Sequence, residues 1–309
     1  MNQTITTPAS LITKAASEQT YYTIRFLADR DRVADAYRAY AYFRWVDDTL
    51  DLAQSGMQQR IAFLEGQKSL LENCYRGESP REATIEENML IELVRHDQEK
   101  NNGLHSYLNN MMRVMEFDAK RRGRLISQAE LNQYTYWLAS AVTEAMHYFI
   151  GHNGYSPHDE TRYLAVTGAH IVHMLRDTFD DVRAGYFNIP REVLEAAHIG
   201  PDDTQSQVYR AWVQSRIQLA RKCFKAGREY LARVENPRCQ LAGFAYTARF
   251  EWLLDTMERE RYNLRPEYRE RKSFGTGLWM GVLTLSSLIN WHGTEPLHQP
   301  VVSHSLRKL

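Results

Sequence analysis

Residues 40–51 read YAYFRWVDDTLD, so that Asp47, Asp48 and Asp51 stand within an aromatic and apolar helical pattern. Arg44 precedes Asp48 by one helical turn and Tyr40 precedes Arg44 by another, and this spacing places the groups on one face of a helix. A largely buried face cannot hold several carboxylates without cations or strong donors, because unpaired buried charge is costly. The stretch therefore predicts a helix that carries a functional site.

A second acidic cluster lies in residues 170–190, HIVHMLRDTFDDVRAGYFNIP. Asp177 and Asp181 repeat the interval of four, with Asp180 beside them. Mg²⁺ characteristically combines one or two carboxylates with waters and phosphate oxygens, and helical bundles build such sites from inward side chains on facing helices. The two clusters together predict metal ions that clamp a diphosphate. Buried salt bridges with Arg44 and Arg176 are the structural alternative.

The composition is that of a globular protein with balanced charge. The chain has 309 residues, 38 Lys+Arg against 38 Asp+Glu, and a mean hydropathy of -0.53. Balanced charge gives no overall field that would attract nucleic acid, and three widely spaced cysteines fit neither a disulfide framework nor a zinc site. Residues 1–20 lack the apolar core of a signal peptide. We expect a cytoplasmic protein, with membrane association as the alternative.

Nine prolines leave long intervals in which apolar residues recur at three and four, a pattern typical of helices. The predicted helices span residues 17–28, 32–54, 57–75, 84–99, 101–119, 127–151, 159–184, 206–234, 238–263 and 267–290. With no predicted strand, repeat or long linker, we expect one all-α domain over residues 17–291, between an N-terminal tail (1–16) and a C-terminal tail (292–309). Residues 274–291 are apolar enough for a final bundle helix or a peripheral contact with a membrane.

With both clusters placed, the sequence resembles the squalene/phytoene synthase family, as a divergent member. The first family motif, Y-x-x-x-R-x-x-D-D-x-x-D, is matched from Tyr40 to Asp51, and the second, L-R-D-x-x-x-D, from Leu175 to Asp181. The resemblance implies a single helical bundle of the class I isoprenoid synthase type around a central cavity. It also implies a Mg²⁺-dependent prenyltransferase that ionises farnesyl or geranylgeranyl diphosphate and joins two prenyl diphosphates head to head.

The resemblance and the chemistry of ionisation assign roles to individual residues. Departure of diphosphate leaves a carbocation and a multiply charged anion, which metal ions and basic donors neutralise. The predicted metal ligands, for Mg²⁺ or Mn²⁺, are Asp47, Asp48, Asp51, His173, Asp177 and Asp181. The predicted diphosphate-binding residues are Arg44, Arg176, Arg183, Arg265 and Arg269. The predicted catalytic residues are Tyr40, Arg44, Tyr136, His170 and His173.

Several positions depart from the family pattern. His170 and His173 stand where the family usually carries glutamine and asparagine, and imidazole is a poorer ligand for Mg²⁺ than for Mn²⁺, Fe or Zn. Each histidine can instead act as an acid or base, donate to diphosphate, or lie in the core. Glu251, Asp255 and Glu258 share one helix face. They are surface charges or, if they point inward, groups that suit a cationic acceptor.

Two other functions stay open on the sequence alone. The first keeps the ionisation step and transfers the prenyl group to a non-prenyl nucleophile, an amine or a phenol. The second is a noncatalytic helical binding protein that retains the bundle as a scaffold, and the intact acidic pairs argue against it. No NADPH site is recognised, although the reductive members of the family need that cofactor.

Overall fold

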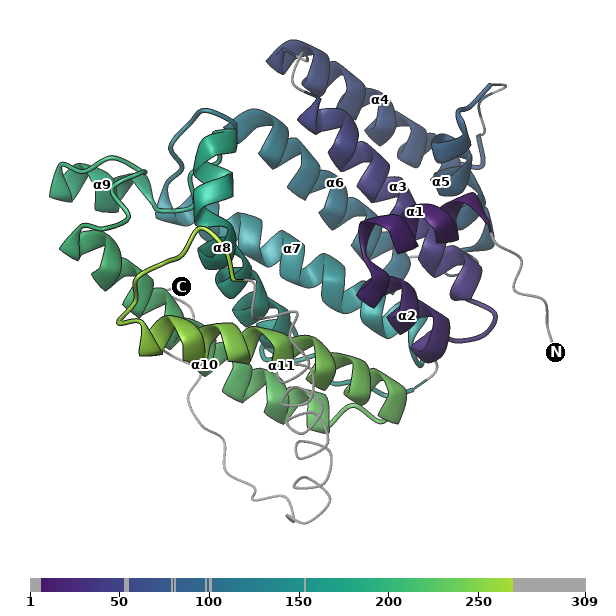
Figure 1. Ribbon diagram of the computed structural model, residues 1–309. Helices are drawn as coiled ribbons and strands as arrows, with labels where there is room; N and C mark the ends of the chain where they lie inside the picture. Colours follow the sequence, from purple (N-terminus) through teal and green to yellow (C-terminus); the bar gives the residue numbers. More distant parts are fainter. Residues whose placement is uncertain are drawn as a thin grey trace. The chain divides into compact units, whose positions relative to one another are not determined.

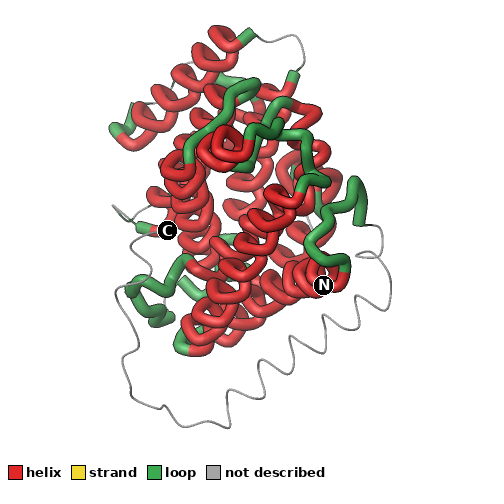
Figure 2. Tube along the Cα trace, turned by 90° about the vertical axis from the view of Figure 1, so that its left-hand side faces the viewer, coloured by secondary structure: helices red, strands yellow, loops and turns green. Residues whose placement is uncertain are grey.

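The computed structural model describes residues 7–52, 56–78, 80, 82–97, 99, 102–152 and 154–268. Over these residues the chain forms eleven α-helices and no strands (Figure 1). Figure 2 shows the same residues as helices joined by loops. The prediction of an all-α fold is confirmed.

The helices follow the proline-free, apolar-periodic intervals of the sequence. They are α1 (Pro8–Ala16), α2 (Glu18–Leu27), α3 (Val33–Asp51), α4 (Met57–Tyr75), α5 (Ile85–His96), α6 (Gly103–Arg121), α7 (Gln128–Phe149), α8 (Leu164–Ala184), α9 (Arg191–Ala197), α10 (Gln207–Ala232) and α11 (Pro237–Arg259). Apart from α1 and α9, each helix begins and ends close to a predicted boundary.

Helices α1 and α9 are not predicted by periodicity. α1 lies inside the segment expected to be an N-terminal tail, and it forms because Thr7 and Ser10 make a capping box and Pro8 occupies the first turn. α9 has seven residues, which is too few to show a helical repeat. The predicted helix 267–290 falls almost entirely outside the described residues, and the apolar stretch 274–291 falls wholly outside them. Within the described part, no helix has the length and apolarity that a membrane crossing needs.

The chain divides into two compact units that are built from separate segments. Of the described residues, the first unit contains those from Thr7 to Arg124, together with those of Trp137–Pro157 and Val234–Ala242. The second contains Leu125–Tyr136, His158–Arg233 and the described residues from Gly243 to Tyr268. Helices α7 and α11 each contribute residues to both units, which explains why no flexible linker marks a boundary in the sequence.

In the first unit, α3 packs against α1, α2, α5 and α6. Tyr42, Val46 and Leu50 are at most 4% exposed. Because they are four residues apart, they form one buried stripe along the helix. The stripe leaves Arg44 and Asp48 exposed on another face of α3. Burial of one face thus presents the acidic motif on the rest of the helix surface.

In the second unit, α8 packs along α10. The two helices lie very close together at Gly227 of α10, where an added Cβ would lie 2.6 Å from the Cα of Ala165. A Cβ at Gly168 of α8 would lie 3.0 Å from the ring of Phe224. Glycine is therefore required at this crossing for reasons of space, and the crossing holds the helix that carries the second acidic cluster.

We expect Gly227→Ala to destabilise the protein by about 1–3 kcal/mol, because the new methyl group overpacks the backbone of α8. The matched control is Gly66→Ala in the middle of α4, where an added Cβ meets nothing within 4 Å. Alanine there should stabilise the helix by about 0.5–1 kcal/mol. Thermal unfolding of both variants measures the difference, and equal effects of the two substitutions would rule out a tight crossing at Gly227.

Candidate active site

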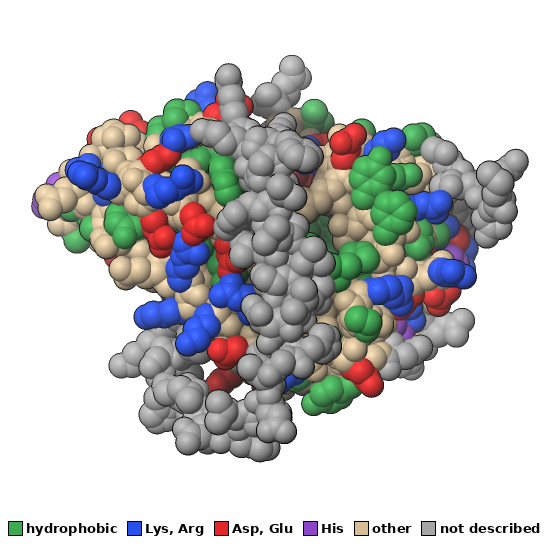
Figure 3. All heavy atoms as spheres, turned by 60° about the horizontal axis from the view of Figure 1, so that its bottom comes forward, with side chains coloured by type: hydrophobic (Ala, Val, Ile, Leu, Met, Phe, Trp, Pro, Cys, Tyr) green, Lys and Arg blue, Asp and Glu red, His purple; other side chains and the backbone are tan. Residues whose placement is uncertain are grey.

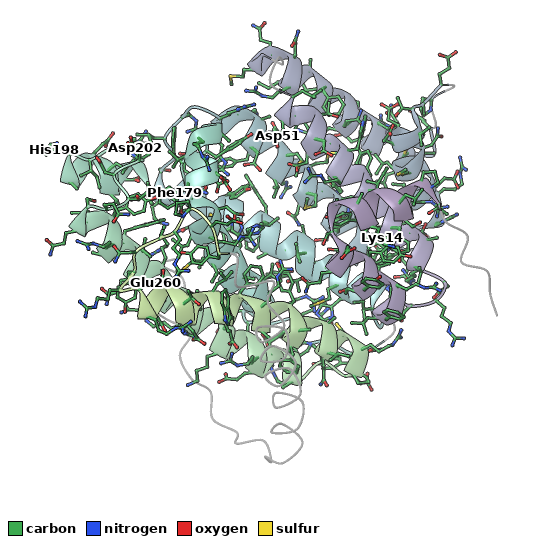
Figure 4. The ribbon with its side chains drawn as sticks, in the orientation of Figure 1. Lys14, Asp51, Phe179, His198, Asp202 and Glu260 are labelled. Carbon is green, nitrogen blue, oxygen red and sulfur yellow. The ribbon has the colours of Figure 1, made fainter. Side chains whose placement is uncertain are left out.

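Three carboxylates and one arginine lie on the exposed face of α3. The side chains of Arg44, Asp47 and Asp48 are 43%, 44% and 55% exposed, and Asp51 is exposed as well. Figure 4 labels Asp51 at the C-terminal end of the helix. The spacing of three and four places these groups on one surface of α3. This surface is exposed, whereas the sequence pattern favoured a largely buried face.

Arg44 binds two of these carboxylates. Its Nε donates to Oδ2 of Asp48 at 3.1 Å, and its Nη1 lies 3.4 Å from Oδ2 of Asp47. Desolvation and the neighbouring charge of Asp51 raise the pKa of Asp47 to about 6, although Arg44 opposes the rise. Asp47 shares the Arg44 guanidinium with Asp48, and its pKa stays raised in spite of it, so an additional cation beside Asp47 would be stabilised there.

Tyr40 lies one turn before Arg44, beside two hydroxyls at the start of α2. Ser17 and Thr20 both hydrogen-bond the Tyr40 side chain, and their own oxygens are 2.9 Å apart. Burial raises the pKa of Tyr40, while Arg44 and the two hydroxyls oppose the rise. The Tyr40 hydroxyl is therefore neutral at pH 7 and belongs to a small cluster of hydroxyl donors and acceptors.

His173, Arg176 and Asp177 form a second group on α8. The Nε2 of His173 lies 2.9 Å from Oδ2 of Asp177, and the Nε of Arg176 donates to Oδ1 of Asp177 at 2.5 Å. Burial acts to raise the pKa of Asp177, but the hydrogen bonds from Arg176 and His173 outweigh it and hold that pKa well below its usual range. The carboxylate is ionised at neutral pH and accepts both bonds.

The contact with Asp177 also fixes the protonation of His173. Burial lowers the pKa of His173, and the charge of Arg176 acts in the same direction against the raising effect of Asp177. An ionised carboxylate can only accept hydrogen bonds, so the Nε2 of a neutral His173 carries the proton and Nδ1 keeps the lone pair. In this arrangement only Nδ1 of His173 is available to a metal ion.

Asp181 is held by Asn188, which is not among the residues predicted from the sequence. The Nδ2 of Asn188 donates to Oδ2 of Asp181 at 2.7 Å, and Asn188 is 7% exposed. The chain returns to the last turn of α8 because Gly185 ends the helix with a φ of 87°. Phe179, labelled in Figure 4, marks this part of α8. The helix-ending glycine is visible in the sequence, but helical spacing says nothing about the contact that follows it.

The other predicted diphosphate-binding arginines make local ion pairs. Arg183 pairs with Asp180, and both side chains are largely exposed. Arg265 pairs with Glu260, which Figure 4 labels just after α11. Arg269 lies outside the described residues, so its predicted role stays a prediction.

Arg249 of α11 is a further basic residue near the α8 group. Its guanidinium carbon lies 4.5 Å from the ring centre of Phe250, and the Phe250 ring centre lies 6.1 Å from that of His173. The charge of Arg249 contributes to the lowered pKa of His173. Because this proximity joins residues that are distant in the sequence, only the tertiary structure reveals it.

The predicted catalytic residues His170 and Tyr136 lie in different surroundings. His170 is 6% exposed and its ring packs edge-on against Tyr134, with ring centres 5.2 Å apart. Tyr136 is 54% exposed and lies edge-on to Tyr163 at 5.9 Å. The aromatic residue of α7 that the structure brings to α8 is therefore Tyr134, and the contact places His170 in the packed interior of the second unit.

The three acids of α11 face arginines of α10. Arg228 pairs with Glu251, and Arg221 pairs with Asp255 and with Glu258, the latter at 2.7 Å. On the face drawn in Figure 3, Lys and Arg side chains lie beside Asp and Glu side chains and do not form a field of one sign. The alternative of a cationic acceptor site built from these three acids loses its basis, because each of them already has a basic partner.

The donor groups fit hard divalent cations that complete their coordination with other oxygens. Among the described residues, no three His, Cys, Asp or Glu side chains converge closely enough to hold a metal ion by themselves. Mg²⁺ commonly takes only one or two carboxylates and fills its remaining positions with waters and phosphate oxygens. The paired carboxylates of α3, and the Asp177 and Asp181 carboxylates of α8, supply oxygen ligands of this kind, and the crowded Asp47 lacks a full counter-charge.

We expect Asp47→Asn to stabilise the metal-free protein at pH 7. The pKa of Asp47 is about 6 in the folded chain against a usual 3.8, so its ionisation favours the unfolded chain and stability falls as pH rises from about 4 to about 6. Because Asp47 is 44% exposed, the gain is at most about 1 kcal/mol after screening by solvent, or about 2–4 °C in Tm.

Thermal unfolding in EDTA measures this effect, and the same comparison at pH 4 is the control because Asp47 is then protonated. Added Mg²⁺ should raise the Tm of the wild-type chain more than that of the variant, since a ligand stabilises the state that binds it. A variant that is less stable than wild type at pH 7 in EDTA would contradict the charge excess on α3.

The fold and these two acidic groups define the class: an all-helical protein in which two helices each present carboxylates together with an arginine. The family model for squalene/phytoene synthase matches residues 13–274. The chain belongs to the squalene/phytoene synthase family, which places it among the prenyltransferases of isoprenoid biosynthesis.

Two solved structures share the fold at low sequence identity. Squalene synthase HpnC from Alicyclobacillus acidocaldarius is 19% identical, with a TM-score of 0.65 over 83% of this chain and 94% of that chain. A dehydrosqualene synthase in complex with a ligand is 16% identical, with a TM-score of 0.68 over 93% of this chain and 96% of that chain. No curated protein matches the chain in sequence.

Proposed function

We propose that this chain is a Mg²⁺-dependent prenyltransferase that condenses two prenyl diphosphates head to head, with farnesyl or geranylgeranyl diphosphate as the substrate. The observation that carries the proposal is the pair of arginine-bound acidic turns, Asp47–Asp51 on α3 and Asp177–Asp181 on α8, in a chain of the squalene/phytoene synthase family. Bound divalent cations would neutralise the departing diphosphate.

The acidic residues and arginines hold the substrate in this proposal. Asp47 and Asp51 provide oxygen ligands from α3, and Asp177 and Asp181 provide them from α8, where Arg176 and Asn188 fix the two carboxylates in place. Arg44 and Arg176 bind carboxylates of their own helices, so cations at those carboxylates would leave the guanidinium groups available to phosphate oxygens. We therefore assign the binding of the departing diphosphate to Arg44 and Arg176.

Aromatic side chains would shield the allylic cation. Ring faces attract cations, and the Tyr40 hydroxyl cluster and the Phe250 ring lie next to the α3 and α8 groups respectively. His173 is neutral and presents Nδ1, which makes it the candidate base for removing a proton from the condensed intermediate. The polar groups act on the diphosphate end, whereas the rings act on the hydrocarbon end.

Transfer to an amine or a phenol stays a weaker alternative. This alternative depended on acidic residues of α11 that point inward and could bind a cationic acceptor. In the structure these acids form ion pairs with Arg221 and Arg228. A noncatalytic scaffold would have no need to keep four separate carboxylates next to arginine or asparagine donors. Head-to-head condensation therefore fits the described contacts best.

Incubation of the purified full chain with farnesyl or geranylgeranyl diphosphate and Mg²⁺ tests the proposal. We expect pyrophosphate release and a hydrocarbon, diphosphate or alcohol product that contains two prenyl chains. Product formation only after an amine or a phenol is added would favour the alternative. Neither release nor binding of any prenyl diphosphate, with or without metal, would favour the scaffold.

A further inference from the structure

Two hydrogen-bond donors on α10 have no acceptor among the described residues. Trp212 is 8% exposed, and its Nε1–H has no hydrogen-bond partner in the described part of the chain. Arg216 follows one turn later, and its buried Nε also has no acceptor there. Residues four apart on a helix have Cβ atoms about 5–6 Å apart, so the two donors belong to neighbouring side chains on one face of α10. Buried polar groups almost always have hydrogen-bond partners, so we expect a hydrogen-bond acceptor for these two donors.

Among the described residues, Arg216 also makes no ion pair with a carboxylate. Burial lowers the pKa of Arg216, and the neighbouring group that opposes this effect is the Cys223 thiol. Burial raises the pKa of that thiol to about 12, so Cys223 is neutral at pH 7 and supplies no negative charge. A partly buried guanidinium without an anion is costly. An anionic acceptor would supply both the missing hydrogen-bond partner and the missing charge.

We propose that Trp212 and Arg216 form a binding site on α10 for a phosphate-class oxyanion. The ligand must accept hydrogen bonds from an indole N–H and a guanidinium, offer no competing donor, and carry negative charge. Phosphoryl oxygens meet these needs, and arginine is the side chain best suited to them. The existence of the site does not depend on the proposed function, but the choice of a diphosphate as its ligand rests on that function.

Tyr209 connects this site to the helix of the second acidic group. Its ring packs edge-on against Trp212, with ring centres 5.6 Å apart. Its hydroxyl hydrogen-bonds Thr178 and lies in the field of Asp181. An oxyanion at Trp212 would thus be separated by one aromatic ring from the part of α8 that carries the predicted metal ligands. The bound group is either the diphosphate of a prenyl substrate or released pyrophosphate.

The test is a titration of the ¹⁵N-labelled full chain with inorganic pyrophosphate in EDTA, where metal-dependent binding is absent. The chain has 6 tryptophans, and the Trp212 indole resonance is the one missing from Trp212→Phe. We expect a saturable shift of this resonance, and at least about a 10-fold loss of affinity in Arg216→Gln. Lys225→Gln removes an exposed cation of the same helix and should change the affinity by less than about 2-fold.

The site would be refuted if the Trp212 indole did not shift at saturating pyrophosphate, or if Arg216→Gln and Lys225→Gln weakened binding equally. A second titration with a prenyl thiodiphosphate identifies the source: competition at the same resonance indicates the substrate, and its absence indicates released pyrophosphate, with the site supported in both cases. A chain that shows the shift but never releases pyrophosphate from a prenyl diphosphate would refute the proposed function and keep the site.

Discussion

Asp177→Asn should lower metal-dependent pyrophosphate release from a prenyl diphosphate by roughly 10²–10³-fold, the range seen when one group that stabilises a developing charge is removed. The carboxylate of Asp177 accepts from Arg176 at 2.5 Å and lies 2.9 Å from His173. The neutral amide in its place brings no negative charge to a cation, and it offers Arg176 one acceptor oxygen in place of two. Single-turnover release of pyrophosphate at saturating Mg²⁺ is the measurement.

Asp255→Asn is the matched control for that substitution. It also removes an aspartate that pairs with an arginine in the second unit, here Arg221, but it has no proposed role in the reaction. We expect less than about a 3-fold change, because exposed ion pairs contribute little. Equal losses in Asp177→Asn and Asp255→Asn would mean that only the integrity of the second unit matters.

The double variant Asp47→Asn/Asp51→Asn should be at least as inactive, with a loss of about 10³-fold or more, while its metal-free form becomes more stable at pH 7. Burial and the neighbouring charge of Asp51 raise the pKa of Asp47, so the double substitution should relieve the folded chain while it removes the proposed cation site. Opposite changes in activity and in Tm are typical of residues kept for function at a cost in stability.

Glu116→Gln provides the control for the first unit. Glu116 of α6 is an ion-paired carboxylate, bonded to Lys68 and Lys120, and its amide should leave pyrophosphate release within about 3-fold of wild type. Its Tm should fall slightly, the reverse of the change expected for the α3 variant. If the α3 double variant kept its activity, the carboxylates of α3 could not be metal ligands in the reaction.

The sequence predicts those parts of the structure that depend on neighbours along one helix. The contacts from Arg44 to Asp48 and from His173 to Asp177 both join residues four apart, as helical geometry requires. Apolar periodicity predicts nine of the eleven described helices. It does not predict α1 and α9, because they are too short to show a helical repeat.

Contacts between distant segments could not be predicted in this way. Asn188 reaches Asp181 through a turn that depends on Gly185, and Arg249 reaches the surroundings of His173 from another helix. The acids of α11 were left with two interpretations because their partners lie on α10. A single sequence gives the face of each helix but not the helix that packs against that face.

The central proposal is that the carboxylates of α3 and those of α8 bind cations that neutralise a diphosphate. A crystal structure of the full chain with Mg²⁺ and a nonhydrolysable prenyl thiodiphosphate tests it most directly. We predict Mg²⁺ at Asp47 or Asp51 of α3 and also at Asp177 or Asp181 of α8 when the diphosphate is bound. A diphosphate bound with no ion at either helix, or ions at one helix alone, would contradict the claim.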